Sequence, residues 1–527
     1  MSKDTLRTVI AFGIIILILI AWQVLFRPKP RPQPPAPPVA HDTVKPPAPE
    51  TTLPKPAPRP APVLVAQTGS PETTLVLENA VMCLELSSRG AALRSVRLKK
   101  YSAELVPPNS GLFGVAPFRG ADTLDVSSAV FAAQATDSSV TFTLAAESAT
   151  VSRTFTLGKE YGLRLSTRLT GATGFRLLGD SGLAYTEKDR REELTHSHFY
   201  ARAGSKVQRL SGKQCKTEQR LAGADWVALK SKYFFIAAVY PDSFSVACPR
   251  TLADGRVAFA ADVPAGSSDI ALYLGPLEYD RLRSYRLGFE EAVSLGWAKP
   301  VALAILWLVK ALYRVFGNWG VAIIVFSILM KAVFYPLTRT QSRQMRQMQL
   351  LQPKLNELKV KFKDNPQALN QETMQLYKLY KINPLSGCLP MLVQLPVFWA
   401  LYSVLRTFID LRGAHFVFWL RDLSQPDTLF GHLPFLGNPA IGLLPVLMGV
   451  SFIAQNLLTA TDKKNWAMTI IFPVFITAMF LNFPSGLQLY WFMYNVLSIV
   501  ESLIATRGGP KWLKKLTRKP QPVMSPN

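Results

Sequence analysis

The chain has 527 residues, of which 49% are hydrophobic, and its formal net charge at pH 7 is +24. The long apolar stretches described below exclude a purely soluble protein, and the length exceeds that of one small domain. The excess of basic residues is compatible with nucleic-acid binding. Much of it lies beside the apolar stretches, however, where anionic lipid is the simpler partner.

The first predicted element is a membrane-spanning anchor over residues 1–26. The stretch VIAFGIIILILIAWQVLF, residues 9–26, is long enough to cross a bilayer. Trp22, Gln23 and bulky residues stand where signal-peptide cleavage needs small ones, so we expect the anchor to be uncleaved. Residues 27–62 are rich in proline and predict an extended linker.

Residues 63–290 predict an all-β domain. Stretches such as SVTFTLAAES, residues 139–148, alternate polar and apolar residues between turn residues. A period of two is typical of strands with one buried face, and this density of strands favours a β-sandwich. Residues 291–318 follow, and Lys310 and Arg314 interrupt their apolar window. We therefore expect an amphipathic helix in the membrane interface there, rather than a further span.

Residues 319–508 hold the remaining predicted spans, which bring the total to six. Apolar windows begin near residue 319 and then cover roughly 383–405, 439–458, 466–483 and 487–506. Residues 338–383 contain two amphipathic stretches on either side of KDNP, residues 363–366, and predict a helical hairpin. Residues 509–527 form a basic tail.

The distribution of charge predicts the topology. Basic residues of the hairpin and the tail include Arg339, Arg343, Arg346, Lys514 and Lys515. Short basic segments between spans remain in the cytoplasm. With six spans, this rule places both termini in the cytoplasm and the β-domain outside it. The same basic residues are expected to face ribosomes or anionic lipid. Trp307, Trp319 and Trp419 are expected to be interfacial anchors.

One residue within the second span stands out from its surroundings. The stretch AIIVFSILMKAVFYPL, residues 322–337, contains Lys331. A lysine near the bilayer centre costs about 2.5–3.5 kcal/mol. No acidic residue lies deep in a predicted span, since Glu501 is near the end of the last one. An ion pair is therefore not expected, and we predict that Lys331 lies in a water-containing hydrophilic groove.

Other readings of these residues remain open. Ser327 and Lys331 share a helical face, as in a Ser–Lys hydrolytic dyad, but no oxyanion donors are visible. A proton-coupled transporter would also use an intramembrane lysine, although such proteins usually show acidic relays and inverted repeats. A membrane scaffold with a snorkelling lysine is the third alternative. His196 and His198 could bind a metal from one side of a strand.

Several motifs occur in an order that resembles a known family. They are NWG at 318–320, YPLT at 335–338, NPLSGCLPMLVQLPVFWALY at 383–402 and FPSGLQLYW at 483–491. Together with the predicted hairpin, these motifs resemble the YidC-type membrane protein insertases of the YidC/Oxa family. The leading span and large outer domain resemble the Gram-negative form with its periplasmic domain. The resemblance implies a polytopic α-helical membrane protein with six spans, a five-helix insertase core and an all-β periplasmic supersandwich domain.

The resemblance also implies a function. A member of this family inserts and helps to fold newly made inner-membrane proteins through a hydrophilic intramembrane groove, alone or with the Sec translocon. No nucleotide hydrolysis, enzymatic activity, cofactor or metal is implied, and the sequence has no GxxxxGK[ST] motif. The implied partners are nascent membrane proteins, the Sec translocon, ribosomes, targeting factors and anionic lipids. The implied protein is a multi-pass monomer of the cell inner membrane.

Site residues carried over by the resemblance line the groove or face the client protein. The family has an arginine in the groove, and this sequence has Lys331 at that position, which keeps the charge but loses the guanidinium fork. Ser327 and Gln394 are implied to line the groove as well. Tyr490 and Trp491 are implied to contact the client.

Overall fold

The structure is a computed structural model that describes residues 71–506, apart from 121, 147–148, 218, 265–266, 364, 381–388, 433–439 and 460–466. The predicted anchor, the proline-rich linker and the basic tail lie outside the described residues. The described residues divide into two compact units. The β-domain unit comprises those up to Ile305 together with Trp399–Ala414, and the helical unit comprises the others.

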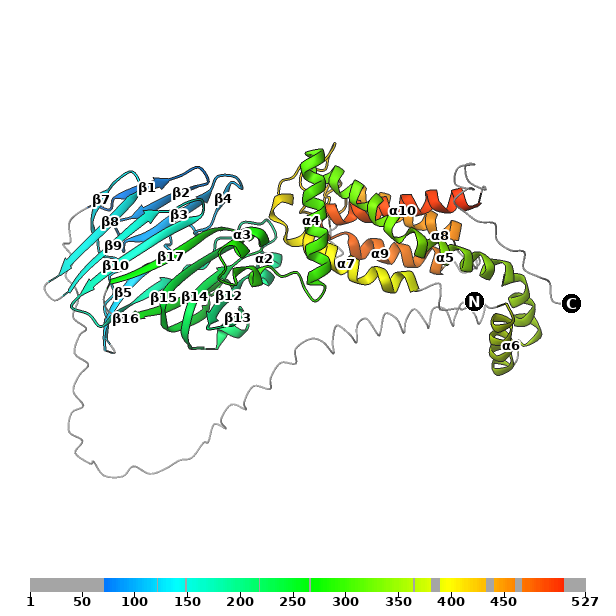
Figure 1. Ribbon diagram of the computed structural model, residues 1–527, viewed down its shortest axis with the longest axis horizontal. Coiled ribbons are helices and arrows are strands. Elements are labelled where there is room, and N and C mark those ends of the chain that lie inside the picture. Colours follow the sequence, from blue (N-terminus) through cyan, green and yellow to red (C-terminus); the bar gives the residue numbers. More distant parts are fainter. Residues whose placement is uncertain are drawn as a thin grey trace, which may run out of the picture. The chain divides into compact units, whose positions relative to one another are not determined.

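The β-domain unit contains two antiparallel sheets, drawn in blue to green in Figure 1. One sheet has four strands in the order β1-β2-β3-β4, and the other has 13 strands. The strands are β1 (Thr74–Glu78), β2 (Met82–Ser87), β3 (Ala92–Leu98), β4 (Ala103–Glu104), β5 (Gly114–Arg119), β6 (Asp122–Thr123), β7 (Ala132–Ala135), β8 (Ser139–Ala146), β9 (Ala149–Leu157), β10 (Gly162–Thr170), β11 (Gly174–Gly179), β12 (His198–Ala203), β13 (Lys206–Ser211), β14 (Leu221–Lys230), β15 (Phe234–Thr251), β16 (Val257–Pro264) and β17 (Ser267–Pro276). The prediction of an all-β sandwich domain is confirmed.

Most residues that are apolar in the period-two pattern of the sequence are buried in the strands. In β9 and β10 every second residue is buried, and the register places Phe155 opposite Leu165, both fully buried. A strand with one buried face requires this alternation, because successive side chains point to opposite faces. Arg153 of β9 is also fully buried and donates to the carbonyl oxygens of Ala91 and Phe113, near the starts of β3 and β5.

Two short helices and three 3₁₀ turns complete the β-domain unit. They are α2 (Arg190–His196), η1 (Gln214–Lys216), α3 (Tyr279–Ser284), η2 (Phe289–Ala292) and η4 (Ile409–Leu411), of which η1, η2 and η4 are 3₁₀ turns and η4 follows a longer helix. Helix α2 begins where the Asp189 side chain accepts hydrogen bonds from the backbone N–H groups of Arg191 and Glu192. Such a cap satisfies amide groups that the first helical turn leaves unpaired.

The helical unit is built from long helices, drawn in green to red in Figure 1. The helices are α5 (Trp319–Lys361), α6 (Pro366–Leu379), α7 (Leu389–Thr407), α8 (Leu443–Thr459), a π-helical turn (Ala467–Ile471), α9 (Phe472–Phe480) and α10 (Ser485–Thr506). Helix α10 packs against α5 and α8, and α9 packs against α8. Helix α7 starts in this unit and continues, from Trp399, into the β-domain unit.

Helix α5 joins the second predicted span to the first part of the predicted hairpin without a break. Asn318 caps it, accepting from the N–H groups of Gly320 and Val321, and Pro336 and Pro353 lie inside it. Helix α6 begins at the proline of KDNP, Pro366, with Asn365 as its N-cap. A proline inside a helix is tolerated where neighbouring groups satisfy the carbonyl that it leaves free.

Helix α4 (Lys299–Phe316) is amphipathic. Ala302, Ile305 and Val309 are buried on one face, whereas Trp307 is 71% exposed. Within the described residues, two helical windows are long and apolar enough to span a membrane, residues Trp319–Pro336 and Ser485–Ile504, and α8 and α9 contain shorter apolar segments. The total of six spans therefore stays a prediction.

Candidate functional site

Lys331 lies in a polar cluster between α5 and α10. Its ammonium nitrogen lies 2.8 Å from the Oε2 atom of Glu501 and donates to the hydroxyl of Ser498 at 2.8 Å. The same nitrogen lies 4.7 Å from the ring centroid of Tyr494. Thr338, two turns further along α5, donates to the other oxygen of Glu501 at 3.1 Å. We call these five residues the ammonium cluster.

The ion pair corrects the prediction that no carboxylate lies near Lys331. The side chains of Lys331 and Glu501 are 12% and 17% exposed, so this pair is mostly buried. Tyr494, Ser498 and Glu501 follow each other at intervals of four and three residues and therefore share one face of α10. The Lys331 side chain contacts this face of α10. Because Glu501 lies near the end of its span, this contact was not expected from the sequence.

Ser327 and Gln394, the other residues predicted to line the groove, form hydrogen bonds outside the ammonium cluster, although the ring centroid of Tyr490 lies 6.2 Å from that of Tyr494. Ser327 is fully buried, and its hydroxyl donates to the carbonyl oxygen of Ile323 in the preceding turn. Gln394 of α7 donates to the hydroxyl of Tyr490 at 2.9 Å, and Tyr490 is only 1% exposed. The structure thus pairs Gln394 with Tyr490, and the proposed exposure of these groups to a client stays a prediction.

Trp491 packs among aromatic side chains. Its ring centroid lies 5.4 Å from that of Phe398 and 5.1 Å from that of Phe480. It is half-buried, so part of its ring is accessible. Offset and edge-to-face contacts of this kind stabilise helix packing, and they coexist with partial exposure. The contact of Trp491 with client proteins stays a prediction.

The basic residues predicted to face ribosomes or lipid are only partly described. Arg339 is half-buried on α5, beyond the membrane-spanning window. Arg343 and Arg346 lie on the same helix, but their side chains are outside the described part. Lys514 and Lys515 belong to the tail, which also lies outside it.

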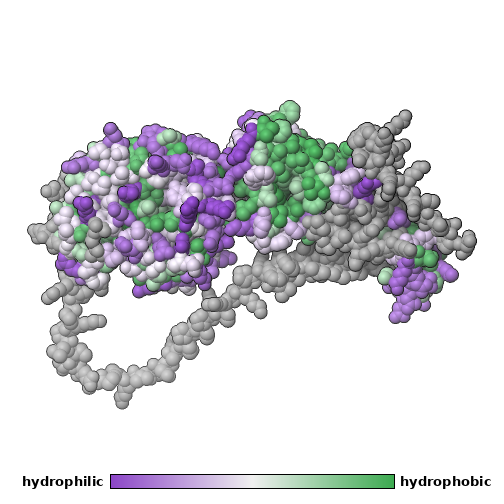
Figure 2. Space-filling view, in the orientation of Figure 1, coloured by the Kyte–Doolittle hydropathy of each residue, from purple (hydrophilic) through white to green (hydrophobic). Residues whose placement is uncertain are grey.

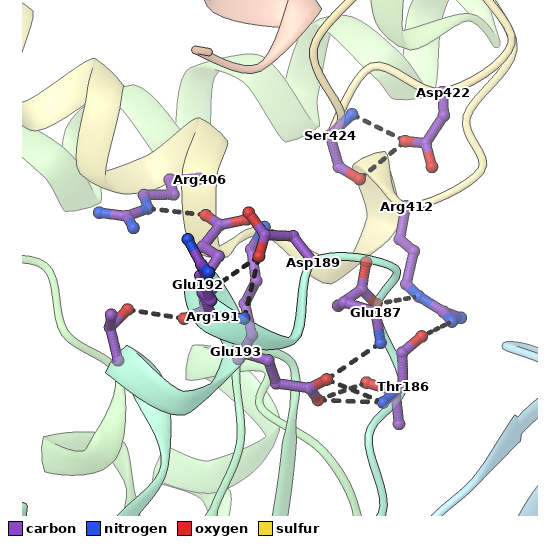
Figure 3. Close-up of polar contacts among 12 residues, drawn as sticks. Thr186, Glu187, Asp189, Arg191, Glu192, Glu193, Arg406, Arg412, Asp422 and Ser424 are labelled. Carbon is purple, nitrogen blue, oxygen red and sulfur yellow. Dashed lines mark hydrogen bonds and ion pairs between the residues drawn. The ribbon is translucent and has the colours of Figure 1, made fainter. Parts of the chain in front are cut away.

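A second polar cluster lies within the β-domain unit and ties the segment Trp399–Ala414 to the strands (Figure 3). Arg412 donates through all three guanidinium nitrogens, to Glu187 at 2.7 Å and to the carbonyl oxygens of Tyr101 and Thr186 at 2.7 and 3.0 Å. Glu187 is nearly buried, and burial raises the pKa of its carboxyl group while Arg412 opposes that change. Arg412 is therefore the counter-ion that this carboxylate needs.

Helix α2 supplies the remaining contacts of this cluster. Glu192 accepts from Arg406 at 3.1 Å and from the buried Lys232 at 3.0 Å. Glu193 accepts from the N–H groups of Thr186 and Glu187, and so fixes the turn that presents Glu187 to Arg412 (Figure 3). None of these residues was predicted from the sequence. Arg406, at the end of α7, and Arg412, five residues beyond that helix, were the available signal.

Of the two histidines considered as metal ligands, His198 is buried and His196 is half-buried, and both lie near the end of α2. His196 is the last residue of this helix rather than part of a strand, and His198 begins β12. Burial lowers the pKa of His196 to about 3 and that of His198 to about 4. His198 lies 2.7 Å from the Arg209 guanidinium. Among the described residues, no group of three or more His, Cys, Asp or Glu side chains is arranged to hold a metal ion.

The fold and the ammonium cluster define a membrane protein in which a β-sandwich domain is joined to apolar helices with a buried ion pair. Two family models match the chain: "YidC periplasmic domain" over residues 74–308 and "60Kd inner membrane protein" over residues 311–511. The curated protein "Membrane protein insertase YidC" of Pelobacter propionicus is 35% identical over 465 residues, which are 81% of this chain and 84% of that protein.

A second curated protein of the same name, from Chlorobaculum parvum, is 32% identical over 551 residues and covers 94% of this chain and 93% of its own. A solved structure described as an active YidC insertase with the first transmembrane domain resolved covers 84% of this chain and 95% of its own, at 17% identity and a TM-score of 0.40. The chain belongs to the family of YidC membrane protein insertases. Its β-domain is the part that matches the periplasmic domain of this inner-membrane family.

Proposed function

We propose that this protein inserts new membrane proteins by offering Lys331 to an acidic group of the client, in exchange for Glu501. The observation that supports this proposal is the 2.8 Å contact between Lys331 and Glu501, a mostly buried pair between α5 and α10. The relatives that match most of the chain are named insertases. The activity of this chain and its mechanism are proposals built on that likeness and on this geometry.

The exchange has a simple physical basis. An unpaired lysine in a membrane helix is costly, and a neighbouring carboxylate removes much of that cost. Replacing Glu501 by a carboxylate of the client keeps Lys331 paired throughout, and the displaced Glu501 retains the hydrogen bond from Thr338. Ser498 and the Tyr494 ring remain in contact with the ammonium group while the carboxylates exchange. Coulomb interactions act strongly in this weakly screened surrounding.

The client's apolar segment supplies the driving force. A short hydrophilic tail must cross the apolar slab, and a hydrophilic groove that begins at the ammonium cluster shortens that distance. The apolar segment then moves along the helices into lipid, where its burial is favourable. No nucleotide is required. Both termini in the cytoplasm, six spans, action with or without the Sec translocon, and contact with ribosomes and targeting factors belong to the same proposal.

The experiment uses purified protein in lipid vesicles and a single-span client with an acidic tail. Protease protection of the translocated tail is compared for the wild type, Lys331→Ala, Lys331→Arg and the double variant Lys331→Ala/Glu501→Gln. The double variant is the matched control, because it leaves no unpaired carboxylate in the cluster. We expect protection with the wild type and Lys331→Arg, and its loss in both alanine variants. Full protection with the double variant would contradict a role for the cation.

The ion pair of Lys331 and Glu501 is also compatible with a second function, proton-coupled transport. A proton-coupled transporter needs an acidic partner for an intramembrane lysine, and Glu501 would provide one. The two functions separate in one measurement, the flux of protons into the same vesicles without a client. An insertase gives no lysine-dependent flux, whereas a transporter gives a flux that Lys331→Ala abolishes and that needs no client.

A further inference from the structure

Two turns in the helical unit expose large apolar side chains. The first covers residues 416–420, where the N–H of Phe416 donates to the carbonyl oxygen of Leu420. The second covers residues 428–431, where the N–H of Gly431 donates to Thr428. Phe418 is 84% exposed in the first turn, and Phe430 is 60% exposed in the second. We call residues 416–420 and 428–431 the rim turns.

The rim turns lie at the level where three helices begin. Phe416 packs directly over Gly320, in the first turn of α5, where any Cβ atom would overlap its ring. Asp427 accepts from the N–H of Leu444, in the first turn of α8, at 2.8 Å. The segment between the two turns also reaches α10, because the N–H of Gly486 donates to the carbonyl oxygen of Leu423 at 3.0 Å.

The candidate spans predict a boundary of the membrane at this level. The apolar window of α5 begins at Trp319 and that of α10 at Ser485, so their first turns mark where the hydrocarbon ends. Lys331 lies twelve residues into α5, about 18 Å from this boundary at 1.5 Å per residue. The rim turns are therefore at the end of the helical unit opposite to the one toward which the ammonium cluster lies. Figure 2 shows apolar surface gathered over the described part of this unit.

One buried carboxylate holds both turns. Asp427 is 5% exposed, and besides Leu444 it accepts from the indole N–H of Trp419 at 3.0 Å and from the N–H of Leu429 at 3.1 Å. Trp419 and Leu429 are the chain neighbours of Phe418 and Phe430. The two exposed rings are thus fixed by a common anchor rather than carried on loose loops.

Both the backbone conformation and the exposure of Phe418 are unfavourable. Its φ angle is +52°, a left-handed backbone conformation that a bulky residue rarely adopts. The ring gains little packing in return, since most of its surface is open. A strained backbone and an exposed apolar side chain in one residue together indicate a surface that binds a partner.

We infer that the rim turns insert Phe418 and Phe430 into the boundary between headgroups and acyl chains of the adjacent leaflet. Lipid fits the surface because the turns sit at the depth of that boundary and continue the lipid-facing surface of the helices. The exposed Arg421 stands between the two turns, where it faces lipid phosphate. Aromatic and basic residues together are typical of this zone. The turns thereby hold the starts of α5, α8 and α10 at a fixed depth.

The inference refines which residues anchor this end of the protein. Trp319 and Trp419 were expected to do so from the sequence. Trp319 is 9% exposed and stacks on Tyr313, with ring centroids 3.8 Å apart, and the indole N–H of Trp419 is bound to Asp427. Trp319 is thus turned inward and Trp419 is bound to the carboxylate that anchors the turns, whereas the two phenylalanines are the exposed aromatic residues.

The test replaces single residues of the full-length protein by p-benzoylphenylalanine, which resembles phenylalanine and forms adducts with nearby C–H groups under light. The positions are Phe418, Phe430 and, as the matched control, Val76, an apolar residue of β1 that is 56% exposed in the β-domain unit. Each variant is placed in vesicles of phosphatidylethanolamine and phosphatidylglycerol and irradiated. The adducts are then identified by mass spectrometry.

The outcomes separate lipid from other partners. Phospholipid adducts at 418 and 430, with none above background at 76, are the expected result. Equal lipid adducts at all three positions would reflect the probe alone and would overturn the inference. Adducts with a second copy of this chain, or no adducts at 418 and 430, would overturn it as well. Adduct formation needs no client, so this result is independent of insertase activity.

Discussion

The Lys331 ammonium group and the Glu501 carboxylate lie 2.8 Å apart, on two helices that begin at the same end of the helical unit. The pair neutralises a charge that would otherwise be costly inside a membrane helix. It also gives the protein an internal carboxylate that occupies the position proposed for the acidic group of a client. Competition between these two carboxylates is the feature from which the first prediction follows.

Glu501→Gln should favour clients with acidic tails over clients with neutral ones. The glutamine keeps the shape of the side chain and the hydrogen bond from Thr338, but it no longer competes for the ammonium group. The translocated fraction of an acidic-tail client, divided by that of its neutral counterpart, should rise above the wild-type value. Protease protection in vesicles measures this ratio. An unchanged ratio would show that Glu501 and the client do not share one site.

Replacement of Arg412 should loosen the segment Trp399–Ala414. Arg412→Ala leaves the nearly buried Glu187 without its counter-ion, which typically costs about 3–5 kcal/mol. Arg412→Lys should recover little, because a lysine cannot reproduce three contacts from one planar group. Hydrogen exchange of residues 399–414 should accelerate in both variants. The double variant Arg412→Ala/Glu187→Gln is the control, and slower exchange than in Arg412→Ala alone is expected there.

Gly320→Ala should destabilise the first turn of α5. A Cβ atom at this position would overlap the Phe416 ring, so the ring and its turn must move. Overpacking of this kind typically costs about 1–3 kcal/mol. The variant Gly320→Ala/Phe416→Ala removes the overlap and should recover part of the lost stability, measured by thermal unfolding in detergent. A double variant less stable than the two single changes combined would show that the overlap is not the cause.

The β-domain should lose stability as the pH falls below 6.5. The folded protein lowers the pKa of His196 to about 3 and that of His198 to about 4, below the unfolded value of about 6.5. Between these limits the unfolded chain binds protons that the folded chain does not. Each histidine thus contributes stability that is fully present above pH 6.5 and declines by up to about 1.4 kcal/mol per pH unit until the folded pKa is reached.

The neighbours of these histidines allow a controlled measurement. His196 faces Arg406, Lys230 and Lys232, and His198 faces Arg209, all of which disfavour a further positive charge. The variant His196→Asn/His198→Gln should have a flatter acid limb than the wild type. Thermal unfolding of the full-length protein between about pH 7.5 and about pH 4.5, a range that crosses the unfolded pKa of histidine, gives both curves. Parallel curves would assign the acid limb to carboxylates instead.

The sequence allowed much of the fold to be predicted, for local reasons. Alternation along 139–148 indicates a strand because side chains on a strand alternate between faces, and this stretch includes β8. The amphipathic pattern around KDNP depends only on neighbouring residues, and a helix lies on either side of it. The continuity of α5 through Pro336 was less accessible, because the groups that compensate for a proline come from elsewhere in the fold.

The candidate site was predicted only in part, because it depends on the register between distant helices. Lys331 was identified from its own surroundings, since a charge inside an apolar helix is visible in one stretch of sequence. That Glu501 meets it follows from how α5 and α10 pack, which no local pattern specifies. The contact of Gln394 with Tyr490 is of the same kind. The hydrogen bonds of Arg412 to Glu187, Thr186 and Tyr101 also join segments that are far apart in the chain.

The central claim is that Lys331 receives an acidic group of the client, and a double-mutant cycle across the two proteins tests it most directly. Translocation in vesicles is measured for wild type and Lys331→Ala, each with a client whose tail carries one aspartate or one asparagine. If the groups pair, removing one should abolish the effect of removing the other, with a coupling of about tenfold, or ~1.4 kcal/mol. Independent effects that simply multiply would contradict the account.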